Sequence, residues 1–415
     1  MAPSLSDPVD LPCGLRLPNR LVKAALGEGL ATSSHQPNLK FFEAYGQWGA
    51  GGWGGILTGN VMVDERHCGS STDVLFEADP FKRPDEAWEA YAEAAQSHGT
   101  PGFVQINHPG RQSPVMGGRK WFWTKNMAPS AVPLNVGSGL LAWFLSAAIW
   151  GTPREMTIEE IRTTTQLFTD AACYVVERGF KGVQIHGAHG FLLAQFLSSK
   201  SNRRTDEYGG TPLKRARFAV EVTRAIRQAV PADVAVGIKF NSVDHQQEES
   251  LHDAIEQIRA IVDAGIDFLE ISGGTYEDPQ MLHARSAANI QSTKSSAREA
   301  HFLDFAREIR RSFPNLTLML TGGFRTRAGM EAALADGACD LIGVGRPAVV
   351  NPAWPKEVLL NENMGNEEAQ LLLNPVNIPS FAKKLGLNFV AAGSETVYYV
   401  MQIARIAKGL RPMAP

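Results

Sequence analysis

The chain has 415 residues, of which 44% are hydrophobic and 20% are charged, and its formal net charge is −3. These values are typical of an ordinary globular protein, and the lack of a basic excess argues against nucleic-acid binding. The cysteines lie far apart without a Cys-x-x-Cys pair, and the first ten residues show no secretory signal. We therefore expect reduced thiols and a cytoplasmic location.

One pattern recurs along the chain: a segment of helical periodicity, then a glycine, then a short β-type apolar run. Glycine just past a helix end readily takes the left-handed conformation, so it marks where each helix stops. Signals of the capping-box type at Thr157, Ser250 and Ser296 mark helix starts. The predicted strands are 21–26, 55–63, 102–107, 182–187, 234–241, 267–273, 316–322 and 341–345. The predicted helices lie near 37–48, 85–98, 157–178, 212–229, 251–264, 297–312, 326–335 and after 352.

Eight alternating strand–helix units favour an α/β protein with a (β/α)8 (TIM) barrel over an open doubly wound sheet. The strand runs are apolar on both faces, as expected for parallel strands covered by helices. Such a barrel needs only ~250 residues, so insertions must account for the remainder. We assign the barrel to residues 1–360, a lid insertion to about 109–156, and a helical extension to 361–415. The extension is expected to pack on the barrel or on a neighbouring subunit of a homo-oligomer.

The insertion contains no charged residue between Lys125 and Arg154. Its apolar run 139–151 is too short to span a membrane, which takes ~20 residues. It is expected to be a buried segment packing across the barrel mouth; a lid facing an apolar substrate is the next reading, and docking on a membrane or partner is the least favoured.

Two motif matches are set aside. The run Gly49 to Gly54 fits the dinucleotide pattern G-x-G-x-x-G, but it follows a helix and precedes a strand, the reverse of the required order. The pair His186 and His189 has metal-like spacing, but no third ligand in a fitting context accompanies it, so no metal site is predicted.

Polar and small residues gather at the predicted carboxyl ends of the strands, where catalytic groups of such barrels lie. Glycine-rich loops follow the last strands and bring backbone N–H groups close to a phosphate, with one arginine for a charge-assisted contact. This pattern predicts a phosphorylated ligand. The strand-end residues are Ala24, Ala25, Asn60, Gln105, His186, His189, Lys239, Ser272, Gly274, Gly323, Gly345 and Arg346.

The stretch 182–210 resembles the old yellow enzyme family, in which a histidine is paired with His or Asn and N-x-R-x-D-x-Y-G-G follows. The chain is also similar to this family at Pro18-Asn19-Arg20, at 105–112, at 321–324 and at 345–347, in unbroken order from about residue 8 to 356.

The resemblance implies FMN in the barrel mouth, reduced by NADH or NADPH in the same cavity. Gln105 would hydrogen-bond the pyrimidine edge of the flavin, and Lys239 would stabilise the negative charge of the reduced ring. Backbone groups around Ala24, Ala25 and Asn60 would lie along the N5–O4 side of the flavin. His186 and His189 would bind a carbonyl oxygen. The phosphate would be held by Ser272, Gly274, Gly323, Gly345 and Arg346.

Two departures from the family pattern affect the expected chemistry. Phe191 stands where the family usually has a proton-donating tyrosine, and a phenyl ring has no proton to give. Gly27 replaces a Thr or Cys that tunes the flavin. Three outcomes stay open: water or another side chain, such as Tyr45 or a lid residue, supplies the proton; the hydride is given and taken back; or reduction is slow.

We therefore expect an FMN-dependent oxidoreductase that reduces the activated C=C bond of an α,β-unsaturated carbonyl compound, bulky and apolar if the insertion is a lid. The first alternative is a redox-neutral flavin-dependent isomerase or cyclase, in which hydride is given and taken back. The second is a non-catalytic barrel that binds flavin or another ligand.

Overall fold

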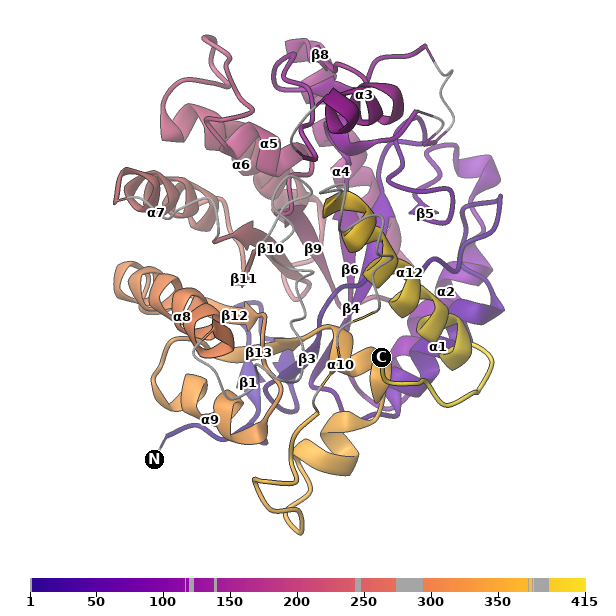
Figure 1. Ribbon diagram of the computed structural model, residues 1–415, viewed down its shortest axis with the longest axis vertical. Helices are drawn as coiled ribbons and strands as arrows, with labels where there is room; N and C mark the ends of the chain where they lie inside the picture. Colours follow the sequence, from indigo (N-terminus) through magenta and orange to yellow (C-terminus); the bar gives the residue numbers. More distant parts are fainter. Residues whose placement is uncertain are drawn as a thin grey trace.

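The computed structural model describes residues 2–115, 117–118, 123–137, 140–242, 248–273, 294–371, 373–374, 376 and 388–415. The core of the molecule is a ring of parallel strands surrounded by helices (Figure 1). β3 (Leu21–Lys23) pairs with β4 (Gly55–Met62) on one side and with β13 (Leu341–Val344) on the other, which closes the ring. The strands between them are, in order, β6 (Gly102–Asn107), β9 (Gly182–Gly187), β10 (Ala235–Asn241), β11 (Phe268–Ser272) and β12 (Thr317–Thr321).

This closed eight-stranded ring confirms the predicted (β/α)8 barrel, and each predicted strand is present. The main difference is at β3, which ends at Lys23, three residues before its predicted end. Ala24 to Leu26 leave the ladder there and line a cavity at the carboxyl ends of the strands.

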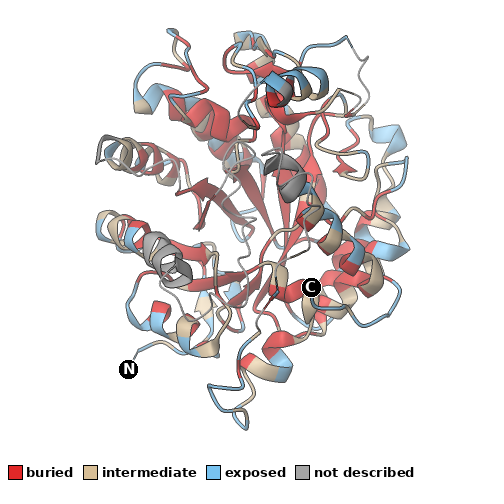
Figure 2. Ribbon diagram, viewed as in Figure 1, coloured by how far each residue is buried: buried red, intermediate tan, exposed pale blue. Residues whose placement is uncertain are grey.

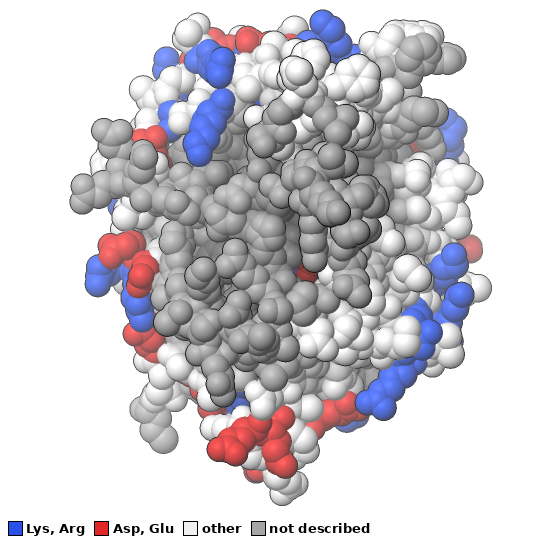
Figure 3. Space-filling model, viewed as in Figure 1, with Lys and Arg blue, Asp and Glu red and all other residues white. Residues whose placement is uncertain are grey.

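The outer ring contains the predicted helices, whose buried faces turn toward the strands (Figure 2). They are α1 (Leu39–Gly49), α2 (Asp85–Gln96), α4 (Ile158–Glu177), α6 (Pro212–Ala229), α7 (Glu248–Val262), α8 (Lys294–Ser312) and α9 (Arg327–Ala335). Short elements follow β13: α10 (Arg346–Val350) and the helical turn η5 (Pro355–Leu359). Charged side chains of both signs lie around the rim on the face shown in Figure 3.

The helix-start predictions had mixed outcomes. Thr157 caps α4 in a complete capping box with Glu160. The predicted starts at Ser250 and Ser296 are wrong, because α7 and α8 each begin two residues earlier. A short polar side chain is tolerated inside a first turn, so local capping signals fix a boundary only to within a few residues.

The barrel end opposite the cavity is closed by side chains. β1 (Val9–Asp10) and β2 (Arg16–Leu17) pair antiparallel just before β3. Leu17 packs in a buried apolar cluster with Phe103, the second residue of β6, and Phe268, the first residue of β11. This cluster shuts the amino-terminal end of the barrel, which leaves the carboxyl end for ligands.

The predicted insertion contains η2 (Gly110–Gln112), the paired strands β7 (Met127–Ala128) and β8 (Arg154–Glu155), and α3 (Leu140–Ile149). Only one face of α3 is buried: Ala142 and Ser146 are 2% and 5% exposed, whereas Leu140, Trp143 and Phe144 are 87%, 66% and 63% exposed. The expectation of a wholly buried segment is therefore wrong, because the helix lies on the outside of the insertion.

The remaining short elements are β5 (Val74–Leu75), η1 (Pro80–Lys82) and α5 (Leu192–Leu197). The last helix, α12 (Asn388–Ile406), packs against α1 and α10 (Figure 1). Within the described residues, no helix combines the length and the apolar character that crossing a membrane requires.

Candidate active site

A cavity of ≈ 780 Å³, part of it open to solvent, lies at the carboxyl ends of β3 and β10 to β13. The predicted site residues that line it are Ala24, Ala25, His189, Lys239, Ser272, Gly323, Gly345 and Arg346. Gly274 lies outside the described residues. The barrel thus brings together strand ends that are up to 322 positions apart in the sequence.

One end of the cavity suits an anion. Arg325 and Arg346 both line it, next to the glycines that follow β12. Gly322 and Gly323 have φ angles of 147° and 79°, which favour glycine and let the backbone turn close to a ligand. The hydroxyl Oγ1 of Thr321 is buried there without a hydrogen-bond partner among the described residues. Two guanidinium groups and close backbone approach are the chemistry that binds a phosphate.

His189 lines the cavity, and His186 lies directly beside His189. Their rings make an edge-to-face contact with centroids 5.0 Å apart, and His189 Nε2 lies 3.2 Å from the Ser272 hydroxyl. The Nδ1 of His186 accepts the backbone N–H of Ala188 at 3.2 Å, so in the neutral ring the proton is on Nε2. Burial lowers the pKa of both rings well below the usual 6.5, and Lys239 lowers both further. The pair is therefore neutral near pH 7.

The backbone at His189 is unusual. Its φ is +58°, in the left-handed region that non-glycine residues seldom occupy, and Gly190 follows with φ +73°. A non-glycine residue in this region costs of the order of 1–3 kcal/mol, and such residues cluster at functional sites. The turn directs the imidazole of His189 toward β11, where it meets Ser272.

Phe191 lies against His186, with ring centroids 4.7 Å apart in an edge-to-face contact, and it precedes α5 as its N-cap residue. It is 6% exposed. The predicted proton donor Tyr45 is fully buried on α1 and donates its hydroxyl hydrogen to Glu28 at 2.5 Å. Tyr45 is not among the residues that line the cavity, so its placement does not support that role.

A polar network crosses the barrel interior below the cavity. Lys239 Nζ lies 2.9 Å from Glu270 Oε1, Glu270 Oε2 accepts from Gln184 at 2.7 Å, and Gln184 Oε1 accepts from the Gln105 amide at 2.6 Å. The side chains of Lys239 and Glu270 are only 4% and 0% exposed. One amide N–H of Gln105 is therefore already used within the barrel. Asn60 pairs in register with Gln105, and its Oδ1 is buried without a hydrogen-bond partner in the described structure.

The sequence expectation that the strands are apolar on both faces is wrong at these inward positions. In a barrel of eight strands the inner faces of neighbouring strands meet, so polar residues can bond one another there. The sequence shows Gln105 in β6 and Gln184 in β9, but it does not show that the closed barrel brings these two side chains together.

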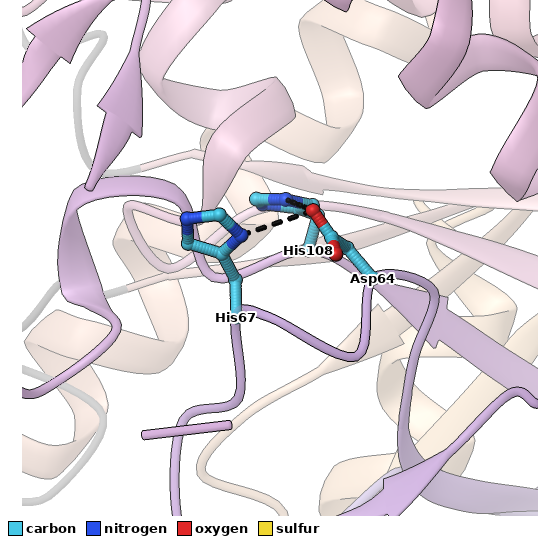
Figure 4. A group of neighbouring side chains, drawn as sticks. All are labelled: Asp64, His67 and His108. Atoms are coloured by element: carbon cyan, nitrogen blue, oxygen red, sulfur yellow. Dashed lines mark hydrogen bonds and ion pairs between the residues drawn. The ribbon is translucent and has the colours of Figure 1, made fainter. Parts of the chain in front are cut away.

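Sequence reasoning also missed a buried cluster of Asp64, His67 and His108 beside the start of the insertion (Figure 4). Asp64 Oδ2 lies 3.0 Å from His67 Nδ1 and 3.5 Å from His108 Nε2. The Arg66 guanidinium binds both oxygens of Asp64 at 3.0 Å. These three donors hold the pKa of the Asp64 carboxyl well below its usual value.

This bonding favours a structural network over a metal site. The Nδ1 of His108 accepts the Gly110 N–H at 3.0 Å, so the proton of the neutral ring is on Nε2, the atom a metal would need. The Arg66 cation on the same carboxylate would further oppose a divalent ion. The cluster ties the loop after β4 to the end of β6.

Comparison with known proteins identifies the family. The profile of the NADH:flavin oxidoreductase / NADH oxidase family matches residues 4–364. The NADH-dependent flavin oxidoreductase iliE of Hypocrea jecorina is 41% identical over 398 residues, which cover 94% of this chain and 97% of that protein. The NADH-dependent flavin oxidoreductase iccE of Talaromyces variabilis is 42% identical, covering 97% and 98% of the two chains. The chain belongs to the old yellow enzyme family.

The solved structure of morphinone reductase supports the same fold, with a TM-score of 0.68 and 24% identity over 86% of this chain and 89% of that one. As an old yellow enzyme, the protein is an NAD(P)H:flavin oxidoreductase whose cofactor is FMN and whose reductant is NADH or NADPH. The cavity fits this cofactor: it combines an arginine-lined, glycine-rich end, a buried lysine, and the unpartnered hydroxyl of Thr321.

Proposed function

We propose that this old yellow enzyme reduces the activated C=C bond of an α,β-unsaturated carbonyl compound. The observation that carries the proposal is the pair of neutral imidazoles, His186 fully buried and His189 partly buried, of which His189 lines the cavity. Neutral N–H groups held in place by the surrounding structure are suited to a carbonyl oxygen that gains negative charge during reaction. Because burial keeps them uncharged, they bind the oxygen without releasing a full proton to it.

When reduced, the bound FMN supplies a hydride. Residues of the chain would hold FMN in place. Its phosphate would be bound by Ser272, Gly323, Gly345 and Arg346, together with Gly274, which lies outside the described residues. Lys239, whose ammonium is held by Glu270, would stabilise the negative charge of the reduced ring. Gln105 and Asn60 would offer amide groups to the ring edges, and Ala24 and Ala25 backbone groups.

The source of the proton decides between two outcomes. Phe191 cannot donate one, and the described residues that line the cavity include no tyrosine, aspartate, glutamate or cysteine. These lining residues would therefore offer no efficient acid to complete a net reduction. A redox-neutral isomerase or cyclase acting on an enone is therefore the second candidate, and both candidates use the same oxygen-binding pair.

We also propose that residues 109–156 form a lid over the barrel mouth and that residues 361–415 form a helical extension that packs on the barrel or on a neighbouring subunit. The insertion starts directly after β6, at the carboxyl end of the barrel. Its helix α3 carries the exposed apolar side chains Leu140, Trp143 and Phe144, which would contact a bulky apolar substrate only when such a lid closes.

The test is an anaerobic turnover experiment with the purified flavoprotein and a series of enones of increasing size. The reductase would be supported if each mole of NADH consumed gave one mole of product that is heavier than the enone by two hydrogens. Product of unchanged mass, formed with only catalytic NADH, would overturn it in favour of the isomerase. Flavin that NADH does not reduce, with no product from any enone, would support a non-catalytic barrel.

Two substitutions test the role of His189 in binding the carbonyl oxygen. His189→Ala should raise the KM for the enone while leaving flavin reduction by NADH largely intact. His98→Ala, which alters an exposed histidine after α2, is the matched control and should behave as the wild type. Equal effects of the two substitutions would contradict the role of His189.

A further inference from the structure

The carboxyl-terminal helix α12 reaches the anion-binding end of the cavity. Arg346, at the start of α10, donates from Nη1 to the Glu395 carboxylate on α12. The two residues are 49 positions apart, and Glu395 lies beyond residue 364, where the match to the family profile ends. α12 packs on both α10 and α1, and Gln47 of α1 donates to the Ile406 carbonyl at 2.6 Å. The helix is thus docked at two places.

The placement of the two charges shows which one faces the cavity. Arg346 lines the cavity, and Glu395 is not among its lining residues. Glu395 is only 5% exposed. The carboxylate therefore lies behind the guanidinium, on the side away from the ligand space.

A second residue of α12 faces the same basic group. Tyr399 lies one helical turn after Glu395 and is 6% exposed, and its hydroxyl has no hydrogen-bond partner within the described structure. Burial raises the pKa of this hydroxyl to about 12, with Arg346, Glu395 and Arg325 all close enough to influence it. Tyr399 thus remains a neutral donor beside the two cavity arginines.

We propose that α12 completes the FMN phosphate site, with Glu395 as a positioning residue that holds the Arg346 guanidinium toward the phosphate. The proposal rests on the assignment of Arg346 to the phosphate in the proposed function. An arginine has five N–H donors in a planar fork, so a bond from Nη1 to Glu395 leaves donors on the other edge of the fork for the phosphate. A guanidinium already fixed in this orientation loses less freedom when the ligand binds.

A Glu395 carboxylate that stood in the phosphate position would have the opposite effect on FMN binding. If the carboxylate occupied the phosphate position, FMN would have to displace it, and removing its charge would tighten FMN binding. The burial of Glu395 behind Arg346 argues for positioning, so removal of its charge should weaken FMN binding.

The experiment compares FMN with riboflavin, which lacks the phosphate. Both flavins are titrated into the flavin-free full-length chain, and binding is followed by quenching of flavin fluorescence. Glu395→Gln should weaken FMN binding about tenfold and leave riboflavin binding unchanged. Glu395→Asp, which keeps the carboxylate, should recover part of the loss. Gln47→Met, which removes a contact of α12 remote from Arg346, is the matched control and should leave the ratio of the two affinities unchanged.

Arg346→Met separates this inference from the proposed function. If Arg346→Met leaves the preference for FMN over riboflavin intact, the assignment of Arg346 to the phosphate fails. If Arg346→Met removes the preference but Glu395→Gln does not, only the positioning role fails. Tighter FMN binding by Glu395→Gln, or equal weakening of both flavins by Glu395→Gln and Glu395→Asp, would also overturn that role. In the Arg346→Met background, Glu395→Gln should have no further effect on the preference.

Discussion

Lys239 forms a buried ion pair with Glu270, so substitutions at these two positions can separate the effect of Lys239 on stability from its effect on the flavin. Lys239→Met would leave the Glu270 carboxylate inside the barrel with the neutral amide of Gln184 as a hydrogen-bond donor. Removing one partner of a buried pair strands a charge, which costs about 3–5 kcal/mol. We expect a loss of this size in the free energy of unfolding, because both side chains are almost fully buried.

The double variant Lys239→Met/Glu270→Gln removes both charges and keeps an acceptor for the Gln184 amide. Its free energy of unfolding should return to within about 1 kcal/mol of the wild type, since a buried pair replaced as a whole is often nearly neutral. The two substitutions should therefore be strongly non-additive, as expected for residues in direct contact.

The stable double variant then reports on the flavin. A hydrogen bond from a charged donor contributes roughly 1.5–3 kcal/mol, so losing the ammonium should lower the two-electron potential of FMN by about 30–65 mV. Urea unfolding of the flavin-free chain measures the change in the free energy of unfolding. Equilibrium reduction of the holoenzyme against a reference dye measures the change in the FMN potential. Lys214→Met, on the exposed surface of α6, is the matched control.

Two results would refute this reasoning. A loss below about 1 kcal/mol for Lys239→Met would mean that the charge of Glu270 is not stranded by the change. An unchanged potential in the double variant would mean that Lys239 does not act on the reduced flavin.

Three further predictions concern Phe191, the two histidines and Lys23. Phe191→Tyr should raise net alkene reduction, by up to about 10²–10⁴-fold where protonation limits turnover; deuterium incorporation and product mass would measure this, and an unchanged product ratio would show that another acid already serves. Because the pKa values of His186 and His189 are lowered well below 6.5, the KM for an enone should stay flat from pH 8 to pH 6, and a break near pH 6.5 would contradict neutral donors. Burial lowers the pKa of Lys23 from 10.5 to about 8, so at this residue the unfolded chain binds more protons between these values and its contribution to stability should rise with pH. The difference in the free energy of unfolding in urea between the wild type and Lys23→Met should rise by up to about 1.4 kcal/mol per pH unit between pH 8 and 10, and a difference that does not change with pH would contradict this reasoning.

The parts of the fold that depend on local pattern were predictable from the sequence. Short apolar runs between glycine-terminated helices located each of the eight barrel strands, because a buried parallel strand needs a continuous apolar segment and glycine ends helices at low cost. The residue types at the strand ends, with the resemblance that they carry, identified the family. The end of β3 was predicted too late, because only the approach of β13 and β4 decides where the ladder stops.

The predicted site residues could be named from the sequence, but not their partners. His189 and Lys239 were expected at the mouth, and the cavity lining includes both. That Gln105 bonds Gln184, and that Lys239 bonds Glu270, depends on the register of adjacent strands after the ring has closed.

The sequence by itself therefore determined the class of barrel, the family and the chemical types present at the strand ends, since these follow from periodicity and residue identity. The tertiary structure alone decided which polar groups share a low-dielectric interior. The Asp64 cluster joins two loops, and Glu395 reaches Arg346 from a helix that no local pattern connects to the cavity. Such contacts are set by packing between distant segments, and the pKa values and charge pairing of the site follow from that packing.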